Sequence, residues 1–289
     1  MATKEEIAAR VRVDHDAGVA HVRLTRPDKR NALDGAMFQA IAQAGERLKN
    51  DLSVRAVVVS GDGPSFCAGL DFGSFQAMGS GGNGSGGNGA GGNGSQNGAD
   101  IGAMVEGRIT HLAQQICWVW QEVPVPVVAA LAGHALGGGM QLALGADIRI
   151  AHPDTKLSMR EVHWGLIPDM TGTLMLSRLV RDDVMKDLVF TGRILPASEG
   201  AALGLVTRLS NDPVADALAV AREIAGRSPE AVRGAKRLIN RLSNAGAAEH
   251  FAAEREIIFK LIGSPNQVEA ITANFENRAP KFNDAPSTY

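Results

Sequence analysis

The sequence contains little cysteine and no long apolar run. Its 289 residues include two cysteines, Cys67 and Cys117, which are far apart and lack the partner spacing of a zinc site or a disulfide framework. We expect both to be packed as small apolar side chains. No stretch approaches the roughly 18 apolar residues of a membrane span, and residues 1–20 lack the apolar run of a signal peptide. The sequence therefore predicts a soluble, cytoplasmic protein with no membrane partner.

An excess of charge of one sign is also missing. The chain has 29 Lys and Arg against 31 Asp and Glu, so its formal net charge is only -2. Proteins that follow a nucleic-acid backbone usually carry a basic stripe, and the sequence offers none. We expect no nucleic-acid partner, and the length is sufficient to bury a full core without one.

The N-terminal half alternates strand patterns with helix patterns, which predicts an α/β core. A helix ending near residue 121 is followed by the breaker PVP at 124–126 and then by a buried strand that runs into glycines. The expected strands are 11–15, 19–24, 55–60, 127–133, 147–151 and 156–159, and the expected helices are 35–49, 101–121 and a short one from Gly138.

Beyond Leu174 the pattern becomes mostly helical. Ser228-Pro229 is a typical helix start, and later helices are expected at about 247–262 and 265–277. The apolar positions of these helices must cover either the core or a neighbouring subunit. We therefore divide the chain into a core, 1–205, and a C-terminal helical region, 206–289.

Residues 79–98 differ from the rest because they consist of Gly, Asn and Ser repeats such as GGNGS. A segment without apolar side chains larger than alanine cannot form a core, so we expect a disordered surface loop inside the core region. A phosphate-binding role would need a strand directly before the loop and a helix N-terminus directly after it, and the sequence does not predict this combination.

Two glycine-containing segments occur where predicted strands end, at 65–71 and 133–147. Glycine there permits a sharp turn and leaves backbone amides exposed, and amides from two such turns can share one oxygen. The alternative is that these glycines only permit close packing of helix on strand. A dinucleotide fingerprint fails at Leu142, and a serine-hydrolase elbow fails at Cys67, because both positions require glycine.

Several segments follow one another in the order of a known family's signatures. They are RPDKRNAL at 26–33, SFCAGLD at 65–71, GHALGGGMQLALGADIRIA at 133–151, EVHWGLIPDMTGT at 161–173 and SPEAVRGAKRL at 228–238. Together they resemble the crotonase (enoyl-CoA hydratase/isomerase) superfamily over nearly the whole chain. The resemblance implies an α/β spiral of ββα units, a C-terminal helical region that forms homotrimers or homohexamers, and an acyl-CoA thioester substrate. It implies no metal or other cofactor, since coenzyme A is part of the substrate.

The resemblance also implies roles for particular residues. The amides of Leu70 and Gly138 match the family's oxyanion hole, which stabilises a thioester enolate. Family hydratases carry one glutamate at position 141 and another at the position of Glu161. This sequence has Gln141, and because an amide cannot take up a proton, we expect simple hydratase activity to be weak or absent.

Asp169 stands where hydratases usually have glycine. The spacing from Glu161 to Asp169 resembles that of dienoyl-CoA isomerases, whose two carboxylates shuttle protons, although those enzymes also carry an acid at position 141. Two alternatives stay open from the sequence. Glu161 can be a surface carboxylate at a strand end, and Asp169 can cap the N-terminus of a helix beginning near Thr171.

The coenzyme A moiety is expected to bind to the backbone at Ala68 and to nearby cations. The alternative is that these cations are ordinary solvated charges of a loop. Trp164 is expected to line the acyl pocket or the core, and His134 to serve packing rather than catalysis. The residues that the resemblance places near coenzyme A are Arg26, Lys29, Arg30, Ala68, Lys281 and Phe282.

Three functions remain open. The first is isomerisation of an unsaturated acyl-CoA, with Glu161 and Asp169 exchanging protons and Gln141 as a polar positioning group. The second is hydration of an enoyl-CoA by Glu161 alone. The third is binding of acyl-CoA without catalysis.

Overall fold

The computed structural model describes residues 3–71, 73 and 101–283 and contains a seven-stranded sheet, ordered β1-β2-β3-β4-β5-β7-β10. The first pairs are antiparallel, and the pairs from β3 onward are parallel. The strands are β1 (Thr3–Ile7), β2 (Val11–Asp16), β3 (Val19–Leu24), β4 (Ala56–Gly61), β5 (Val127–Leu131), β7 (Ile148–Ala151) and β10 (Arg208–Leu209).

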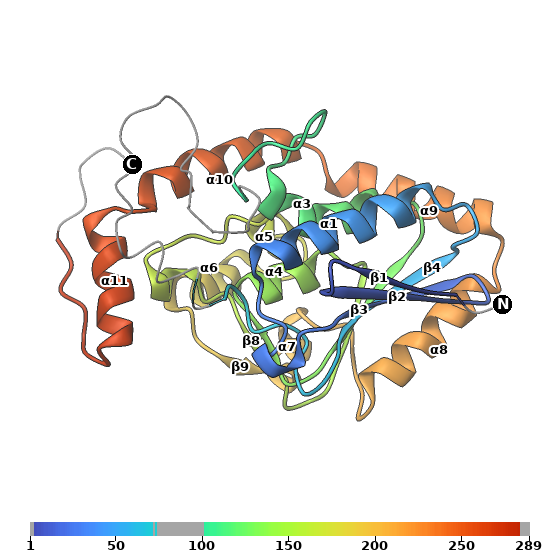
Figure 1. The fold of residues 1–289 in the computed structure, drawn as a ribbon, viewed down its shortest axis with the longest axis horizontal. Coiled ribbons are helices and arrows are strands. Elements are labelled where there is room, and N and C mark those ends of the chain that lie inside the picture. Colours follow the sequence, from blue (N-terminus) through green and yellow to red (C-terminus); the bar gives the residue numbers. More distant parts are fainter. Residues whose placement is uncertain (1–2, 72, 74–100, 284–289) are drawn as a thin grey trace.

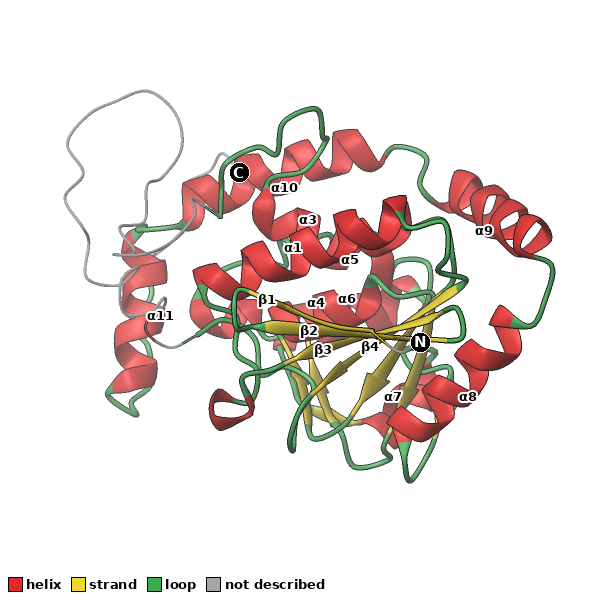
Figure 2. Cartoon of the chain, turned by 45° about the vertical axis from the view of Figure 1, so that its right-hand side comes forward, coloured by secondary structure: helices red, strands yellow, loops and turns green. Residues whose placement is uncertain are grey.

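Helices cover both faces of this sheet (Figure 2). Helices α1 (Gly35–Asn50) and α3 (Leu112–Glu122) pack together on one face, and α8 (Pro213–Ala225) packs on the other. Alternate residues of β4 serve the two layers: Val57 and Val59 face the main core, whereas Val58 belongs to the cluster under α8. Burial on both faces explains why the parallel strands are continuous apolar runs.

Smaller elements between β5 and β10 carry the candidate site. A second sheet has the order β6-β8-β9. Its strands are β6 (His134–Leu136), β8 (Lys156–Ser158) and β9 (Leu195–Pro196). The helices of this region are α4 (Gly138–Leu144), the 3₁₀ helix η2 (Glu161–Trp164), α5 (Gly172–Leu176), α6 (Asp182–Thr191) and α7 (Ala197–Leu203). Outside this region, a second 3₁₀ helix, η1 (Pro27–Lys29), follows β3.

Three helices follow α8 in the described part of the chain: α9 (Pro229–Ser243), α10 (Ala247–Leu261) and α11 (Pro265–Phe275). In Figure 1, α9 lies at the upper right, α10 at the top and α11 at the left of the molecule. The start at Ser228 is confirmed, because its side chain accepts a hydrogen bond from the amide of Ala231. Three large apolar side chains of α9 are exposed: Leu238, Ile239 and Leu242. Their covering by a neighbouring subunit, and with it the trimer or hexamer, stays a prediction.

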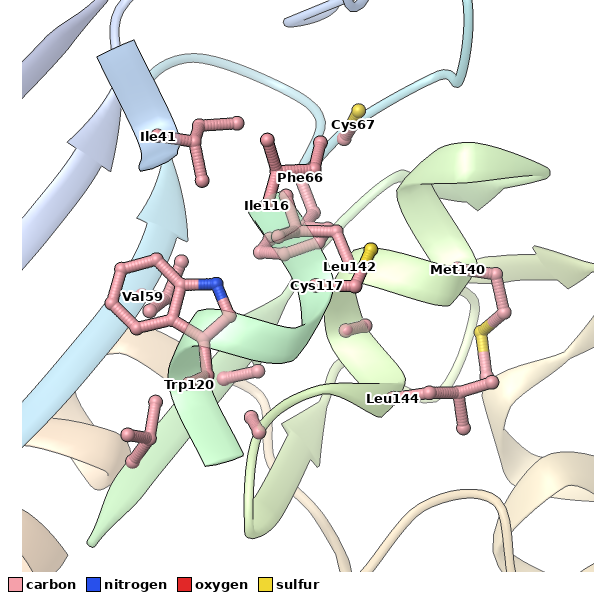
Figure 3. Close-up of a cluster of buried hydrophobic side chains, with 14 of the residues drawn as sticks. Ile41, Val59, Phe66, Cys67, Ile116, Cys117, Trp120, Met140, Leu142 and Leu144 are labelled. Atoms are coloured by element: carbon pink, nitrogen blue, oxygen red, sulfur yellow. The ribbon is translucent and has the colours of Figure 1, made fainter. Parts of the chain in front are cut away.

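The α/β class with a helical C-terminal region is confirmed, and both cysteines are buried as expected. Figure 3 shows Cys67 and Cys117 among apolar side chains that include Phe66, Ile116 and Trp120. No helix of the described residues is long and apolar enough to cross a membrane. The loop predicted at 79–98 lies outside the described residues.

One expected boundary was wrong, and one strand was missed. The helix predicted from residue 101 begins only at Leu112, because His111 caps it: its ring nitrogen accepts the amide hydrogen of Gln114, whose side chain accepts in return from the His111 amide. Strand β1 was missed because TKEEI is charged and lacks a run of β-branched residues, yet it pairs along β2 as an edge strand.

The C-terminal region does not begin as a separate layer. Strand β10 pairs with β7 of the main sheet, and α8 covers one face of it. The division at residue 205 therefore stays a prediction about folding units, while the structure places the first elements after it in the core.

A buried lysine helps to attach helix α9 to the core, together with hydrogen bonds from Arg233 to the Val54 carbonyl and from Asn240 to the Gln121 carbonyl. The Lys236 ammonium donates to the carbonyls of Trp120 and Val125, at 2.9 and 3.0 Å, and to the Asp147 carboxylate at 2.7 Å. The side chain is nearly inaccessible, so all its hydrogen bonds are made to protein.

Replacement of Lys236 by Met is expected to lower the free energy of unfolding by about 3 kcal/mol, because it leaves a carboxylate and two carbonyls without their donor. Urea denaturation measures the loss. The exposed neighbour Arg237, changed to Met, serves as the control and should shift stability by less than about 0.5 kcal/mol. Equal effects of the two changes would contradict the anchoring role of Lys236.

Candidate active site

The two glycine-containing turns predicted from the sequence meet in space. The amide of Cys67 donates to the His134 carbonyl at 2.9 Å, and the amide of Leu136 donates to the Cys67 carbonyl at 3.1 Å. Gly69, at φ +93°, lies so close that an added Cβ would be 2.7 Å from the Leu136 carbonyl oxygen and 3.8 Å from the Gly138 nitrogen. Only glycine permits both this backbone angle and this approach.

Both turns present an amide that donates to no described residue. The amide of Leu33 donates to the Gly69 carbonyl at 2.8 Å, and the Leu33 carbonyl accepts from the amide of Asp71 at 3.0 Å. Because successive amides of an extended segment point to opposite sides, the amide of Leu70 faces away from Leu33. Gly138 is the first residue of α4, and the first amides of a helix have no partner within it. The turns therefore bring two available donors together.

Glu161 lies beside these turns, on the first residue of η2. Its Oε1 would be 3.3 Å from a Cβ built on Gly137, and its Oε2 is buried with no partner among the described residues. Because the side chain is 8% exposed, the alternative of a surface carboxylate is wrong. Desolvation raises the pKa of Glu161 to about 7, against the opposing hydrogen bonds from its own amide and from Gln141.

Gln141, fully buried on α4, connects Glu161 to the turn after Asp169. Its Nε2 donates to Glu161 Oε1 at 2.6 Å, while its Oε1 accepts from the amides of Met170 and Gly172 at 2.8 and 3.0 Å. This arrangement requires one donor and one acceptor on the same side chain, which an amide has and an ionised carboxylate lacks.

Asp169 follows η2 and precedes α5. The predicted N-cap role is wrong, because α5 begins at Gly172 behind Thr171 and no side chain caps it. The carboxyl is only half-buried, yet desolvation within the surrounding protein raises its pKa to about 8. The negative charges of Glu254 and then Glu161 raise this pKa further.

An apolar wall stands next to the Leu70 turn. Leu70, Trp164, Leu166 and Ile271 form one cluster, in which Ile271 comes from α11. The rings of Trp164 and Phe275 are 6.4 Å apart, so α11 forms the outer side of this wall. The sequence pointed to Trp164 but missed the contribution of α11.

The cations expected near coenzyme A differ in their surroundings. Arg26 is already paired, because its guanidinium contacts Asp71 at 2.8 Å and Asp34 at 3.4 Å. Lys29 and Arg30 are exposed and form no ion pair with any described residue. Of the three, only Lys29 and Arg30 offer uncommitted charge to a phosphate.

The remaining residues expected near coenzyme A are placed as follows. The amide of Ala68 donates to the Arg30 carbonyl at 3.0 Å, which leaves its own carbonyl as the available backbone group. The segment with Lys281 and Phe282 folds back on α11, where the Lys281 amide donates to Glu269 at 2.6 Å. Contact of this exposed segment with coenzyme A stays a prediction.

The Nδ1 of His134 lies 2.9 Å from the hydroxyl of Ser65, a buried side chain in the first glycine turn, and a role of His134 in packing rather than catalysis stays a prediction. Within the described residues, no three His, Cys, Asp or Glu side chains converge on a position that could hold a metal ion.

Sequence reasoning missed a third acid near the site, Glu254 of α10. Its spacing carried a signal: Phe251, Glu254 and Ile258 recur at intervals of three and four residues, so the acid lies on the buried face of the helix. An acid in that position requires partners, and the structure supplies them from α3 and from the turn before α5.

Known proteins match this chain over nearly its whole length. Residues 19–287 match the family model described as enoyl-CoA hydratase/isomerase. The mouse (Mus musculus) enoyl-CoA hydratase domain-containing protein 2 is 31% identical, over 96% of this chain and 88% of its own. The mouse methylglutaconyl-CoA hydratase is 29% identical, over 97% of this chain and 84% of its own.

A solved structure confirms the expected fold. The enoyl-CoA hydratase/isomerase of Pseudoalteromonas atlantica T6c superposes with a TM-score of 0.77 at 29% identity, covering 95% of this chain and 100% of the other. The family match spans more than half of the sequence and includes both glycine turns, Glu161 and Asp169. The chain therefore belongs to the enoyl-CoA hydratase/isomerase family of acyl-CoA enzymes.

Proposed function

We propose that this protein isomerises an unsaturated acyl-CoA by moving protons through a thioester enolate. One observation carries the proposal: the amides of Leu70 and Gly138 have no described partner and lie at the same junction as Glu161, whose Oε2 is buried and unbonded. A thioester oxygen placed on the two amides gains charge when a proton leaves the adjacent carbon. Donors that are already fixed stabilise that charge, and loss of one costs about 3 to 4 kcal/mol.

The environments of the two carboxyls suggest opposite roles. Burial brings the pKa of Glu161 to about 7, so near neutral pH a large fraction is ionised and can accept a proton. Asp169, with a pKa of about 8, is mostly protonated at the same pH and can donate one. Glu161 removes a proton at one end of the conjugated system and Asp169 delivers one at the other, which shifts the double bond without a change in composition.

Hydration is the second candidate, favoured by the printed names of the mouse relatives. Gln141 cannot accept a proton, so Glu161 would have to activate water and return the proton by itself.

Purified protein assayed on 3,5-dienoyl-, 3-enoyl- and 2-enoyl-CoA discriminates isomerisation from hydration. Isomerisation of the first two with slow hydration of the third supports the proposal. Rapid hydration alone overturns it.

Replacement of Glu161 by Gln is expected to lower kcat about 10²- to 10⁴-fold with little change in KM, because it removes the proton acceptor but keeps the side chain volume. Steady-state kinetics on the preferred acyl-CoA measures the effect. Glu223, exposed on α8, is changed to Gln as the control. Undiminished isomerisation by the Glu161 variant would contradict the role of Glu161 as proton acceptor. Tight binding of acyl-CoA by the wild type, without deuterium exchange at the acyl α-carbon, would indicate a non-catalytic binding protein.

The profile of kcat against pH is expected to be bell-shaped. It should rise as pH passes about 7, where Glu161 loses its proton, and fall above about 8, where Asp169 loses the proton that it must donate. The Asp169→Asn variant should be slower and should lack the alkaline decline. A profile of kcat against pH tests this, and an alkaline limb that persists unchanged in the variant would exclude Asp169 as its cause.

The Gln141→Glu variant is expected to move the acidic limb to higher pH. It places a second carboxyl where Nε2 now donates to Glu161 at 2.6 Å, and a like charge at that distance disfavours ionisation of Glu161. The same profile of kcat against pH detects the shift. Gln43→Glu, an exposed change on α1, is the matched control. An unmoved acidic limb would show that Gln141 does not control the ionisation of Glu161.

A further inference from the structure

Helix α10 carries a buried carboxylate that contacts the same turn as Gln141. Glu254 is 4% exposed, and both of its oxygens accept hydrogen bonds. Oε2 accepts from the Gln114 side chain at 2.9 Å and from the amide of Thr171 at 3.2 Å, and Oε1 accepts from the Thr173 hydroxyl at 3.1 Å. The Thr171 amide belongs to the turn that follows Asp169, and the Thr173 hydroxyl belongs to the start of α5, directly after that turn.

That turn is held in an unfavourable backbone conformation. Thr171 has φ +69°, in the left-handed region that a β-branched residue rarely adopts, and its buried hydroxyl has no described partner. Such a residue persists only where its surroundings fix it. Here the amides of Met170 and Gly172 donate to Gln141, and the amide between them donates to Glu254. Two side chains from distant parts of the chain thus fix three consecutive amides.

We propose that Glu254 is a positioning residue of the active site, which fixes the Met170–Gly172 turn and thereby the place of the Asp169 carboxyl. The proposal rests on the proposed function, because it assigns Glu254 a part in the reaction that Asp169 performs. It adds a polar residue of the C-terminal helical region to a site to which α11 already contributes apolar side chains.

The charges around Glu254 determine its effect on Asp169. His250, one turn earlier on α10, lies 3.5 Å from Glu254, and its pKa is raised mainly by this hydrogen-bonded neighbour. Arg178 lies close enough to His250 to act on the same pKa in the opposite direction. Across the helix, the Arg255 guanidinium contacts the Gln114 side chain at 3.2 Å.

The other titratable groups facing this region are the Glu161 carboxyl on η2 and the Cys117 thiol on α3. Burial raises the pKa of Cys117 well above its ordinary value, so the thiol stays neutral. The negative charge of Glu254 therefore acts on Asp169 together with that of Glu161, and both favour the protonated acid. Removal of the Glu254 charge should release the Asp169 proton at lower pH.

The Glu254→Gln variant tests the proposal through two measurements. Titration of the Asp169 side-chain carbon, followed by ¹³C NMR, should move to lower pH, and the alkaline limb of the rate profile should move with it. The value of kcat should fall about ten- to hundredfold with little change in KM, because the acid is displaced from its working geometry. Glu256→Gln, an exposed change on the same helix, is the control and should leave both measurements unchanged.

A second variant removes the imidazole that lies beside Glu254. The His250 side chain is 41% exposed, so its replacement by Gln is compatible with folding, and it removes an imidazole whose pKa is raised by its hydrogen bond to Glu254. Because a protonated imidazole offsets the Glu254 charge, its loss should move the Asp169 titration toward higher pH, opposite to the first variant. This variant carries the test alone if Glu254→Gln does not fold.

The outcomes separate the two proposals. Unmoved Asp169 titrations in the folded variants overturn the role of Glu254, and so does a variant that lowers only the melting temperature. The NMR titration needs no substrate. A wild-type protein inactive on every acyl-CoA therefore overturns the proposed function, even where the titrations shift as expected.

Discussion

The structure depends on a junction between two chain segments that are far apart in the sequence. The strand-like segment at Cys67 pairs with β6, and that pairing places Gly69 against the Leu136 carbonyl and beside the Gly138 nitrogen. No side chain fits between them, so the two turns approach until the amides of Leu70 and Gly138 lie together. Everything proposed about catalysis requires these amides to be spared by the hydrogen bonding of the fold itself.

Around that junction, the protein keeps ionisable groups in low-dielectric surroundings by means of neutral or shared hydrogen bonds. Gln141 donates to Glu161 and accepts from the turn after Asp169, so it orders both acids without adding charge. Glu254 orders the same turn from α10 and adds a charge. One neutral and one charged partner explain how two nearby carboxyls can have distinct environments and therefore distinct roles.

The named relatives provide a comparison for the roles of these two carboxyls. The mouse proteins of similar sequence are named as hydratases, whereas this chain combines Gln141 with Asp169 on the shared fold. Family membership therefore accounts for the scaffold and for acyl-CoA as the substrate class. The proposed isomerisation depends on a few side chains at the junction, and at Gln141 and Asp169 the chain departs from the hydratase pattern that its family resemblance implies.

The sequence by itself determined what depends on local chemistry: the α/β class from strand and helix periodicity, the two turns from residues that must be glycine, and Glu161 with Asp169 from their place in recognisable motifs. It could not determine partners that are distant along the chain. The pairing of Arg26 with Asp71, the start of α3 at Leu112, the absence of a cap at Asp169 and the approach of Glu254 to Thr171 were decided only by the tertiary structure. The physical reason is that charge, burial and hydrogen-bond capacity are properties of the group, whereas the partner that satisfies them is chosen by the packing of the whole chain.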